Sequence, residues 1–137
     1  MSYAGDITSS EAFDRLQSAP NAVLIDVRTH AEWTFVGIPD LSSIGRELLT
    51  ISWSSYPGGV RNQDFLDELA EAGLDEDQEL LFLCRSGARS KSAAIAATDR
   101  GYTAFNVSDG FEGPLDDGGH RNTKSGWRSS GLPWRQN

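Results

Sequence analysis

The sequence predicts an α/β fold in which a central parallel sheet of about five strands lies between helices on both faces. Three observations predict this fold. Short apolar runs recur along the chain, segments with helical spacing alternate with them, and glycines or prolines separate the two kinds of segment. A length of 137 residues is typical of one domain, so we expect residues 1–137 to share a single core.

The chain is expected to open with a helix and to continue into a buried strand. Thr8 and Glu11 have the spacing of a capping box, and the helix that they begin is expected to end near Pro20. Residues 22–26, AVLID, form an apolar run typical of a buried strand. The following residues 27–33, VRTHAEW, are predicted to form a polar turn.

The middle of the chain contains a segment without a clear pattern and then a second helix. Residues 37–60 hold two Gly/Pro clusters and receive no firm assignment. Asn62 is predicted to be the N-cap of a helix, because apolar residues recur after it at helical spacing until Gly73, a typical helix end.

Two further strands are predicted in the second half, with a helix between them. ELLFL, residues 79–83, is a second buried strand, and a short loop leads from it into an alanine-rich helix that ends at Gly101. TAFNVS, residues 103–108, is a further strand. The remainder is Gly-rich and polar, with Trp127 and Trp134 as expected anchors.

Composition and charge exclude several classes of function. The net charge of −8 repels nucleic acid and anionic lipid surfaces, so neither is expected as a partner. No apolar run approaches the roughly 18 residues of a membrane span, and the first residues have no targeting pattern, so the cytoplasm is the expected location. Cys84 is the single cysteine, which excludes an internal disulfide and a cysteine-rich zinc site; no metal or other cofactor is expected.

The chemistry is expected to lie in the loop that follows the strand at 79–83. Cys84 comes directly after this strand, and the carboxyl ends of parallel strands are where such sheets place their ligands. The small residues Ser86, Gly87 and Ala88 allow a six-residue loop, residues 84–89, to turn its N–H groups inward. The next helix, expected to begin near Ser90 as its N-cap, directs its dipole to the same place.

Positive side chains accompany this loop and favour an anionic substrate. Arg85 and Arg89 are candidate anion-binding residues. Arg89 is the stronger candidate, because a positive side chain at a helix start is unfavourable next to the helix dipole and its presence there therefore indicates a role in binding. The thiolate is the reactive form of cysteine, and both the loop and the helix terminus stabilise negative charge. The sequence therefore predicts an activated sulfur at Cys84 that faces an anion pocket.

CRSGARS at residues 84–90, taken with LIDVR at 24–28, resembles the rhodanese-like family of thiosulfate sulfurtransferases. The resemblance covers nearly the whole chain, including Gly-Ile-Pro at 37–39 and the closing GWRSSGLPW at 126–134. It implies a parallel sheet between helices, with Cys84 as the nucleophile and residues 85–89 as the walls of the pocket.

The same resemblance gives supporting roles to residues outside the loop. Asp26 and Arg28 match the DVR signature of the family and would brace the loop through hydrogen bonds and ion pairs, and Glu32 would join them.

Two features depart from the family pattern. The family commonly has Gly-His-Ile-Pro where this chain has Gly37-Ile38-Pro39, so a histidine that is usually structural is absent. Residues 111–126 form a longer connection than usual. This extension holds His120, Asp116 and Asp117; a lid and a solvated loop are the two alternatives, and the solvated loop is favoured.

The predicted activity is that of a thiosulfate:cyanide sulfurtransferase. Cys84 would take a sulfane sulfur from a small anionic donor such as thiosulfate and pass it to cyanide, to a thiol or to a protein partner. One alternative is a non-catalytic module or a dedicated sulfur carrier. A cysteine-dependent phosphatase or arsenate reductase is less favoured, because tyrosine-type phosphatases place five residues between cysteine and arginine, and here there are four.

Overall fold

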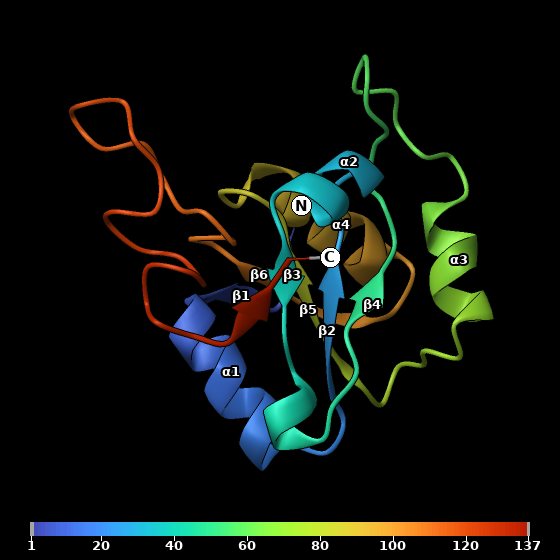
Figure 1. The fold of residues 1–137 in the computed structure, drawn as a ribbon. Helices are drawn as coiled ribbons and strands as arrows, with labels where there is room; N and C mark the ends of the chain where they lie inside the picture. The colour runs from blue at the N-terminus through green and yellow to red at the C-terminus, as the bar shows by residue number, and fades with distance from the viewer. Residues whose placement is uncertain (1, 137) are drawn as a thin grey trace.

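A five-stranded parallel sheet forms the centre of the structure, a computed structural model that describes residues 2–136 (Figure 1). The strand order is β1-β6-β5-β2-β4, and every neighbouring pair is parallel. The strands span Gly5–Ile7 (β1), Ala22–Asp26 (β2), Leu49–Thr50 (β4), Glu79–Leu83 (β5) and Thr103–Val107 (β6). The prediction of a parallel sheet between helices is therefore confirmed.

Helices cover both faces of this sheet (Figure 1). They span Ser9–Ser18 (α1), His30–Phe35 (α2), Phe65–Glu71 (α3) and Ala88–Asp99 (α4), with a short 3-10 helix at Ser42–Ile44 (η1). A small antiparallel pair joins Ile38–Pro39 (β3) to Trp134–Arg135 (β7). Among residues 2–136, no helix is both long and apolar enough to cross a membrane.

The core is divided by the sheet into two apolar layers. One layer packs α3 and α4 against the sheet through Phe65, Leu69 and the alanines of α4. The other packs α1 against the opposite face and includes Phe111 and Trp127 from the closing segment. The central strands β2 and β5 consist mostly of buried apolar residues because apolar clusters pack against both faces of the sheet, as expected for parallel strands.

Local capping signals explain where two of the helices begin. The capping box of Thr8 and Glu11 is present in both directions, as predicted, and α1 follows it. The prediction of Asn62 as an N-cap is wrong: α3 begins at Phe65 after Asp64. Asn62 instead accepts a hydrogen bond from the backbone N–H of Asp64 and so shapes the turn before the helix.

The polar turn predicted for residues 27–33 is also wrong in its second half. Thr29 is the N-cap of α2, where its side chain accepts from the backbone N–H of Glu32 and the Glu32 carboxylate accepts from the N–H of Thr29. This is a second capping box, and it begins a helix that leads away from the carboxyl end of β2. It also fixes the position of Glu32 near the sheet edge where Cys84 lies.

Candidate active site

Cys84 lies directly after β5, near the middle of the sheet, and is 1% exposed. Its Sγ accepts a hydrogen bond from the backbone N–H of Gly87 at 3.2 Å and lies 3.1 Å from the Ser90 hydroxyl. The first turn of α4 follows this loop at once, so its free N–H groups and positive dipole end lie at the same edge of the sheet. The sulfur thus lies beside hydrogen-bond donors and a helix N-terminus.

The loop is shorter than the sequence indicated. The helix α4 begins at Ala88 and its N-cap is Gly87, so the predictions of a six-residue loop and of Ser90 as N-cap are wrong. Gly87 has φ 107°, which favours glycine, and a Cβ there would come too close to the carbonyl oxygen of Ser108. The turn after Cys84 is therefore packed against the end of β6.

Ser90 supports the sulfur directly instead of capping the helix. It is fully buried, and its hydroxyl donates to Oδ1 of Asn106 at 2.6 Å. The amide of Asn106 donates in turn to Asp6, which fixes its orientation because a carboxylate only accepts. The single hydroxyl hydrogen of Ser90 can serve either Asn106 or the Cys84 sulfur. Ser90 can thus accept from the thiol and, by rotation of its hydroxyl, donate to the thiolate.

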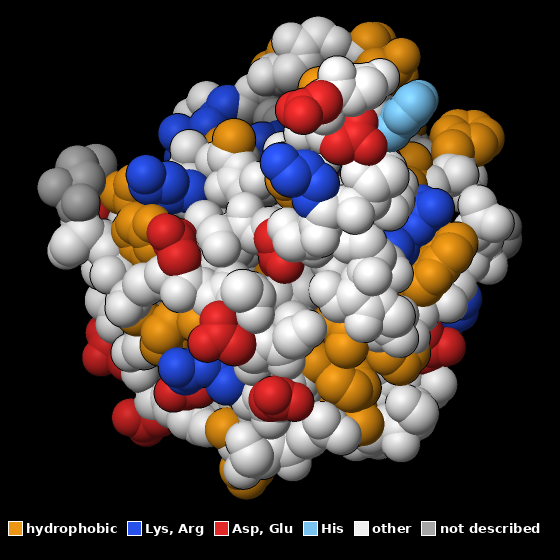
Figure 2. Space-filling view, turned by 90° about the vertical axis from the view of Figure 1, so that its left-hand side faces the viewer, with side chains coloured by type: hydrophobic (Ala, Val, Ile, Leu, Met, Phe, Trp, Pro, Cys, Tyr) orange, Lys and Arg blue, Asp and Glu red, His pale blue; other side chains and the backbone are white. Residues whose placement is uncertain are grey.

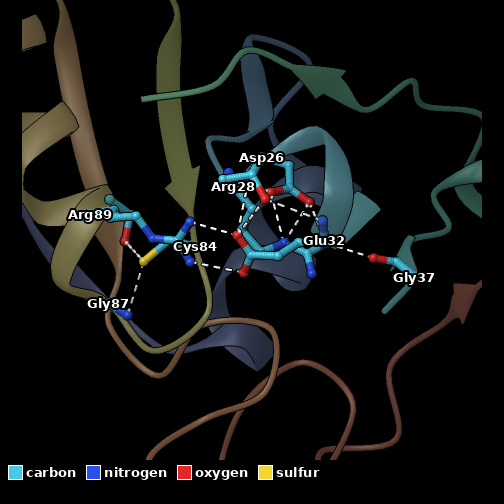
Figure 3. A network of polar contacts seen from close by, with 9 residues as sticks. Asp26, Arg28, Glu32, Gly37, Cys84, Gly87 and Arg89 are labelled. Carbon is cyan, nitrogen blue, oxygen red and sulfur yellow. Dashed lines mark hydrogen bonds and ion pairs between the residues drawn. The ribbon is translucent and has the colours of Figure 1, made fainter. Parts of the chain in front are cut away.

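Arg89 is held by Glu32 across the site. The two side chains form a bidentate pair with N···O distances of 2.7 and 2.9 Å, and Figure 3 shows the guanidinium pointing toward this carboxylate. Burial opposes ionisation of Glu32, but hydrogen bonds from Arg89 and from the Thr29 backbone outweigh it and lower its pKa to about 2. The hydrogen bond to Glu32 raises the pKa of Arg89, which burial opposes, and the nearby Cys84 raises that pKa further.

Asp26 and Arg28 form a fully buried ion pair of 2.7 Å, but they support the loop less directly than the sequence indicated. Within residues 2–136, neither side chain forms a hydrogen bond or an ion pair with the loop. Arg28 donates to the carbonyl of Gly37 and lies over the ring of Phe111, 4.3 Å from its centroid. The Phe111 N–H donates to the carbonyl of Cys84, so the support passes through this residue.

A pocket of about 720 Å³ opens beside this network. Its charged lining residues are Arg85, Arg89, Glu32 and Glu112. The pocket is further lined by residues 54–56 and 59 of the loop after β4, by Thr29, and by Ala31, Phe35 and Val36 of α2. Of the predicted loop residues, Arg85 and Arg89 therefore line the pocket, whereas Cys84, Ser86, Gly87 and Ala88 do not.

The extension at residues 111–126 contributes little to this pocket. Of its residues only Glu112 is part of the lining. Asp116 accepts hydrogen bonds from the backbone of Gly118 and His120 and from the Thr123 hydroxyl, so the tip closes on itself, and the His120 side chain is 76% exposed. Figure 2 shows acidic and basic side chains interspersed on the left-hand side of the Figure 1 view, where this segment lies.

Several site residues were not found by sequence reasoning. Asn106 carried a signal, since it is a polar residue within an otherwise apolar strand. Thr29 carried another, because its spacing to Glu32, which was predicted as a supporting residue, equals that of Thr8 to Glu11. Phe35 and Tyr56 carried none, because only the folded chain brings α2 and the loop after β4 to one pocket. Residues 2–136 hold no group of three or more His, Cys, Asp and Glu side chains able to bind a metal ion.

Comparisons with known proteins agree with this architecture. The crystal structure of Rv0390 from M. tuberculosis is similar with a TM-score of 0.89 and 52% identity, and the match covers 99% of this chain and 100% of that one. An uncharacterized protein of Rickettsia rickettsii, an RP600 homolog, is 41% identical over 132 residues, which are 95% of this chain and 96% of that protein.

More distant relatives have rhodanese and sulfurtransferase names. Rhodanese-like domain-containing protein 4 of Arabidopsis thaliana is 26% identical over 129 residues, 93% of this chain and 25% of that protein. The thiosulfate:glutathione sulfurtransferase of Saccharomyces cerevisiae is 29% identical over 93 residues, 66% of this chain and 62% of that protein. The model of the family described as the STR4 middle domain matches residues 4–137. The chain therefore belongs to this family of rhodanese-like domains.

Proposed function

We propose that this protein is a sulfurtransferase in which Cys84 accepts a sulfane sulfur as a persulfide and passes it to a thiophilic acceptor. The observation that carries the proposal is the setting of the Cys84 sulfur. It receives the Gly87 N–H, contacts the Ser90 hydroxyl and lies at the start of α4, beside a pocket lined by Arg85 and Arg89. The sulfurtransferase names of distant relatives support the same chemistry.

The reaction has two displacement steps. In the first, the Cys84 thiolate attacks the outer sulfur of a donor such as thiosulfate; the Sγ–S bond forms while the S–S bond of the donor breaks, and sulfite leaves with the electron pair. In the second, an acceptor such as cyanide or a thiolate attacks the outer sulfur of the persulfide and restores the Cys84 thiolate. The Gly87 N–H and the Ser90 hydroxyl can donate to the sulfur anions, and Arg85 is free to hold the donor, since it forms no ion pair within residues 2–136.

Phosphoryl transfer fits the site less well. The turn between Cys84 and α4 has only three residues. Arg89 donates from Nη1 and Nη2 to Glu32, so this arginine is not free to hold a phosphoryl group. Hydrolysis of an aryl phosphate separates the two chemistries.

The test is the intact mass of the protein after incubation with thiosulfate, before and after addition of cyanide. We expect a gain of one sulfur atom in the wild-type protein, its removal by cyanide as thiocyanate, and no gain in Cys84→Ser. Ser92→Ala, an exposed residue of α4 outside the site, serves as the matched control and should gain sulfur normally. No gain from thiosulfate or from any persulfide donor would overturn the proposal, and aryl phosphate hydrolysis without sulfur loading would replace it.

A further inference from the structure

The pocket beside Cys84 is nearly neutral and partly apolar, which is unusual for a site expected to bind a small dianion. From this we infer that its preferred sulfur donor is an organic monoanion, a thiosulfonate or persulfide whose apolar body lies between Phe35 and Tyr56, in preference to the thiosulfate dianion. This inference rests on the proposed function, because it names the donor class of the same site.

The charges of the lining cancel. Arg85 and Arg89 face Glu32 and Glu112, so the formal charge of the pocket is zero. Arg89 donates from Nη1 and Nη2 to the two carboxylate oxygens of Glu32, which leaves Arg85 as the cation without an ion pair among the described lining residues. One free guanidinium matches one negative charge, and the overall charge of −8 adds a long-range penalty that doubles for a dianion.

The size of the pocket also exceeds what an inorganic anion needs. A volume of about 720 Å³ lies within the range of sites for drug-sized organic ligands. Thiosulfate has five heavy atoms and would leave most of this space to water. An organic donor would fill more of this space.

The apolar part of the lining is formed by two walls. Phe35 ends α2 and is 78% exposed, and Tyr56 lies in the loop after β4 and is 72% exposed. Ser54 and Arg61 form a β-bridge, and Ser55 donates to the carbonyl of Val60, so this loop has a defined backbone. Large aromatic side chains that remain exposed at the rim of a pocket gain by covering an apolar ligand.

The first displacement step forms and breaks the same kinds of bond with such a donor as with thiosulfate. The Cys84 thiolate attacks the terminal sulfur of R–SO₂–S⁻, the Sγ–S bond forms, the donor S–S bond breaks, and the sulfinate R–SO₂⁻ leaves with the electron pair. A persulfide R–S–S⁻ reacts in the same way and releases the thiolate R–S⁻. Only the leaving group differs from the thiosulfate reaction, and it sets the intrinsic reactivity of each donor. The contribution of the pocket is therefore measured by comparing the same donor across variants.

Three probes separate apolar contact from charge: thiosulfate, methanethiosulfonate and benzenethiosulfonate, each with cyanide as acceptor. The two thiosulfonates carry the same charge and differ in the size of the apolar body. We expect the double variant Phe35→Ala/Tyr56→Ala to lower kcat/KM about tenfold for benzenethiosulfonate and less than about twofold for the other two donors. Comparison of each donor with itself across variants removes differences in intrinsic reactivity.

A charge variant tests the second half of the inference. Glu112→Gln gives the pocket one net positive charge, and we expect it to raise kcat/KM about threefold for thiosulfate and less for both monoanions. Leu115→Ala is the control, because it removes an apolar side chain that is 53% exposed and lies outside the pocket. It should leave all three values unchanged.

The outcomes distinguish this inference from the proposed function. Equal losses for all donors in the aromatic double variant, or wild-type kcat/KM that is highest for thiosulfate, would overturn the inference while sulfur loading still supports the sulfurtransferase. Failure of all three donors to load Cys84 would instead overturn the proposed function.

Discussion

At the scale of single residues, the pair of Glu32 and Arg89 connects folding with the site. Its two members come from α2 and α4, so their hydrogen bonds hold together two helices that follow neighbouring strands. The pair is only partly exposed, with 20% for Glu32 and 27% for Arg89, so solvent weakens it less than an open surface pair. It keeps the guanidinium of Arg89 near the sulfur of Cys84.

Glu32→Gln should therefore destabilise the protein in a pH-dependent manner. The folded pKa of Glu32 is about 2, below the ordinary value of 4.5, so the ionised carboxylate stabilises the fold. This contribution, up to about 3 kcal/mol, is fully present above the ordinary pKa and is lost as the pH falls through about 2. Urea unfolding should show a large difference from wild type near pH 7 and a smaller one near pH 3.

The exposed glutamate Glu71 of α3 provides the control for this experiment. Glu71→Gln should change the free energy of unfolding by no more than about 0.5 kcal/mol at either pH. A Glu32→Gln difference that stays constant between the two pH values would show that the carboxylate charge does not stabilise the fold.

At the scale of elements, the sequence predicted those segments whose signals are local. The central strands β2 and β5 are continuous apolar runs, and α1 has a capping box followed by apolar residues at helical spacing. The helix α2 was missed because it buries no residue and so has no apolar periodicity; only its capping box marks it. The strands β4 and β7 have two residues each, too few for a pattern, and they exist through pairing with distant parts of the chain.

The residues of the candidate site also fall into those that local sequence predicts and those that only the fold brings together. Cys84, Arg85 and Arg89 were predictable because they belong to one short segment with a strand before it and a helix after it. The start of α4 was misplaced because Ser90 is a typical N-cap residue, whereas the close packing of Gly87 on Ser108 is visible only in the fold. The pocket-lining residues of α2 and of the loop after β4 come together through long-range contacts, which no local sequence pattern predicts.

The turn between β5 and α4 offers a test of this packing. Gly87→Ala should cost about 2–3 kcal/mol of unfolding free energy, because φ 107° is strained for alanine and its Cβ would meet the Ser108 carbonyl oxygen. The displacement should also move the Gly87 N–H away from Sγ and slow persulfide formation. Chemical denaturation and the rate of sulfur loading measure the two effects.

Gly73→Ala separates backbone strain from the steric contact. Gly73 also has a positive φ, of 84°, but nothing lies within 4 Å of the added Cβ, and it follows α3 and is not part of the pocket lining. It should cost about 1 kcal/mol and leave sulfur loading unchanged. Equal effects of the two alanine variants would show that the contact with Ser108 does not constrain the turn.

At the scale of the whole molecule, electrostatic effects on the site come from two sources of different range. The net charge of −8 acts over the Debye length, which is about 30 Å at low salt and about 8 Å at physiological ionic strength. The charges that line the pocket cancel and act at short range. At low salt an approaching anion is therefore repelled by the protein as a whole before it meets Arg85.

This separation of ranges predicts how the reaction responds to salt. Because added NaCl screens the long-range repulsion, kcat/KM for thiosulfate should rise about two- to threefold as the ionic strength increases from roughly 0.01 to roughly 0.15 M. Benzenethiosulfonate should show about half of this effect on a logarithmic scale, because it carries half the charge. Steady-state rates at fixed cyanide measure both slopes, and the ratio between them cancels any common effect of salt on the acceptor step. If the thiosulfate rate fell with salt instead, a positive local field would dominate the approach, and Glu32 and Glu112 would not neutralise the two arginines.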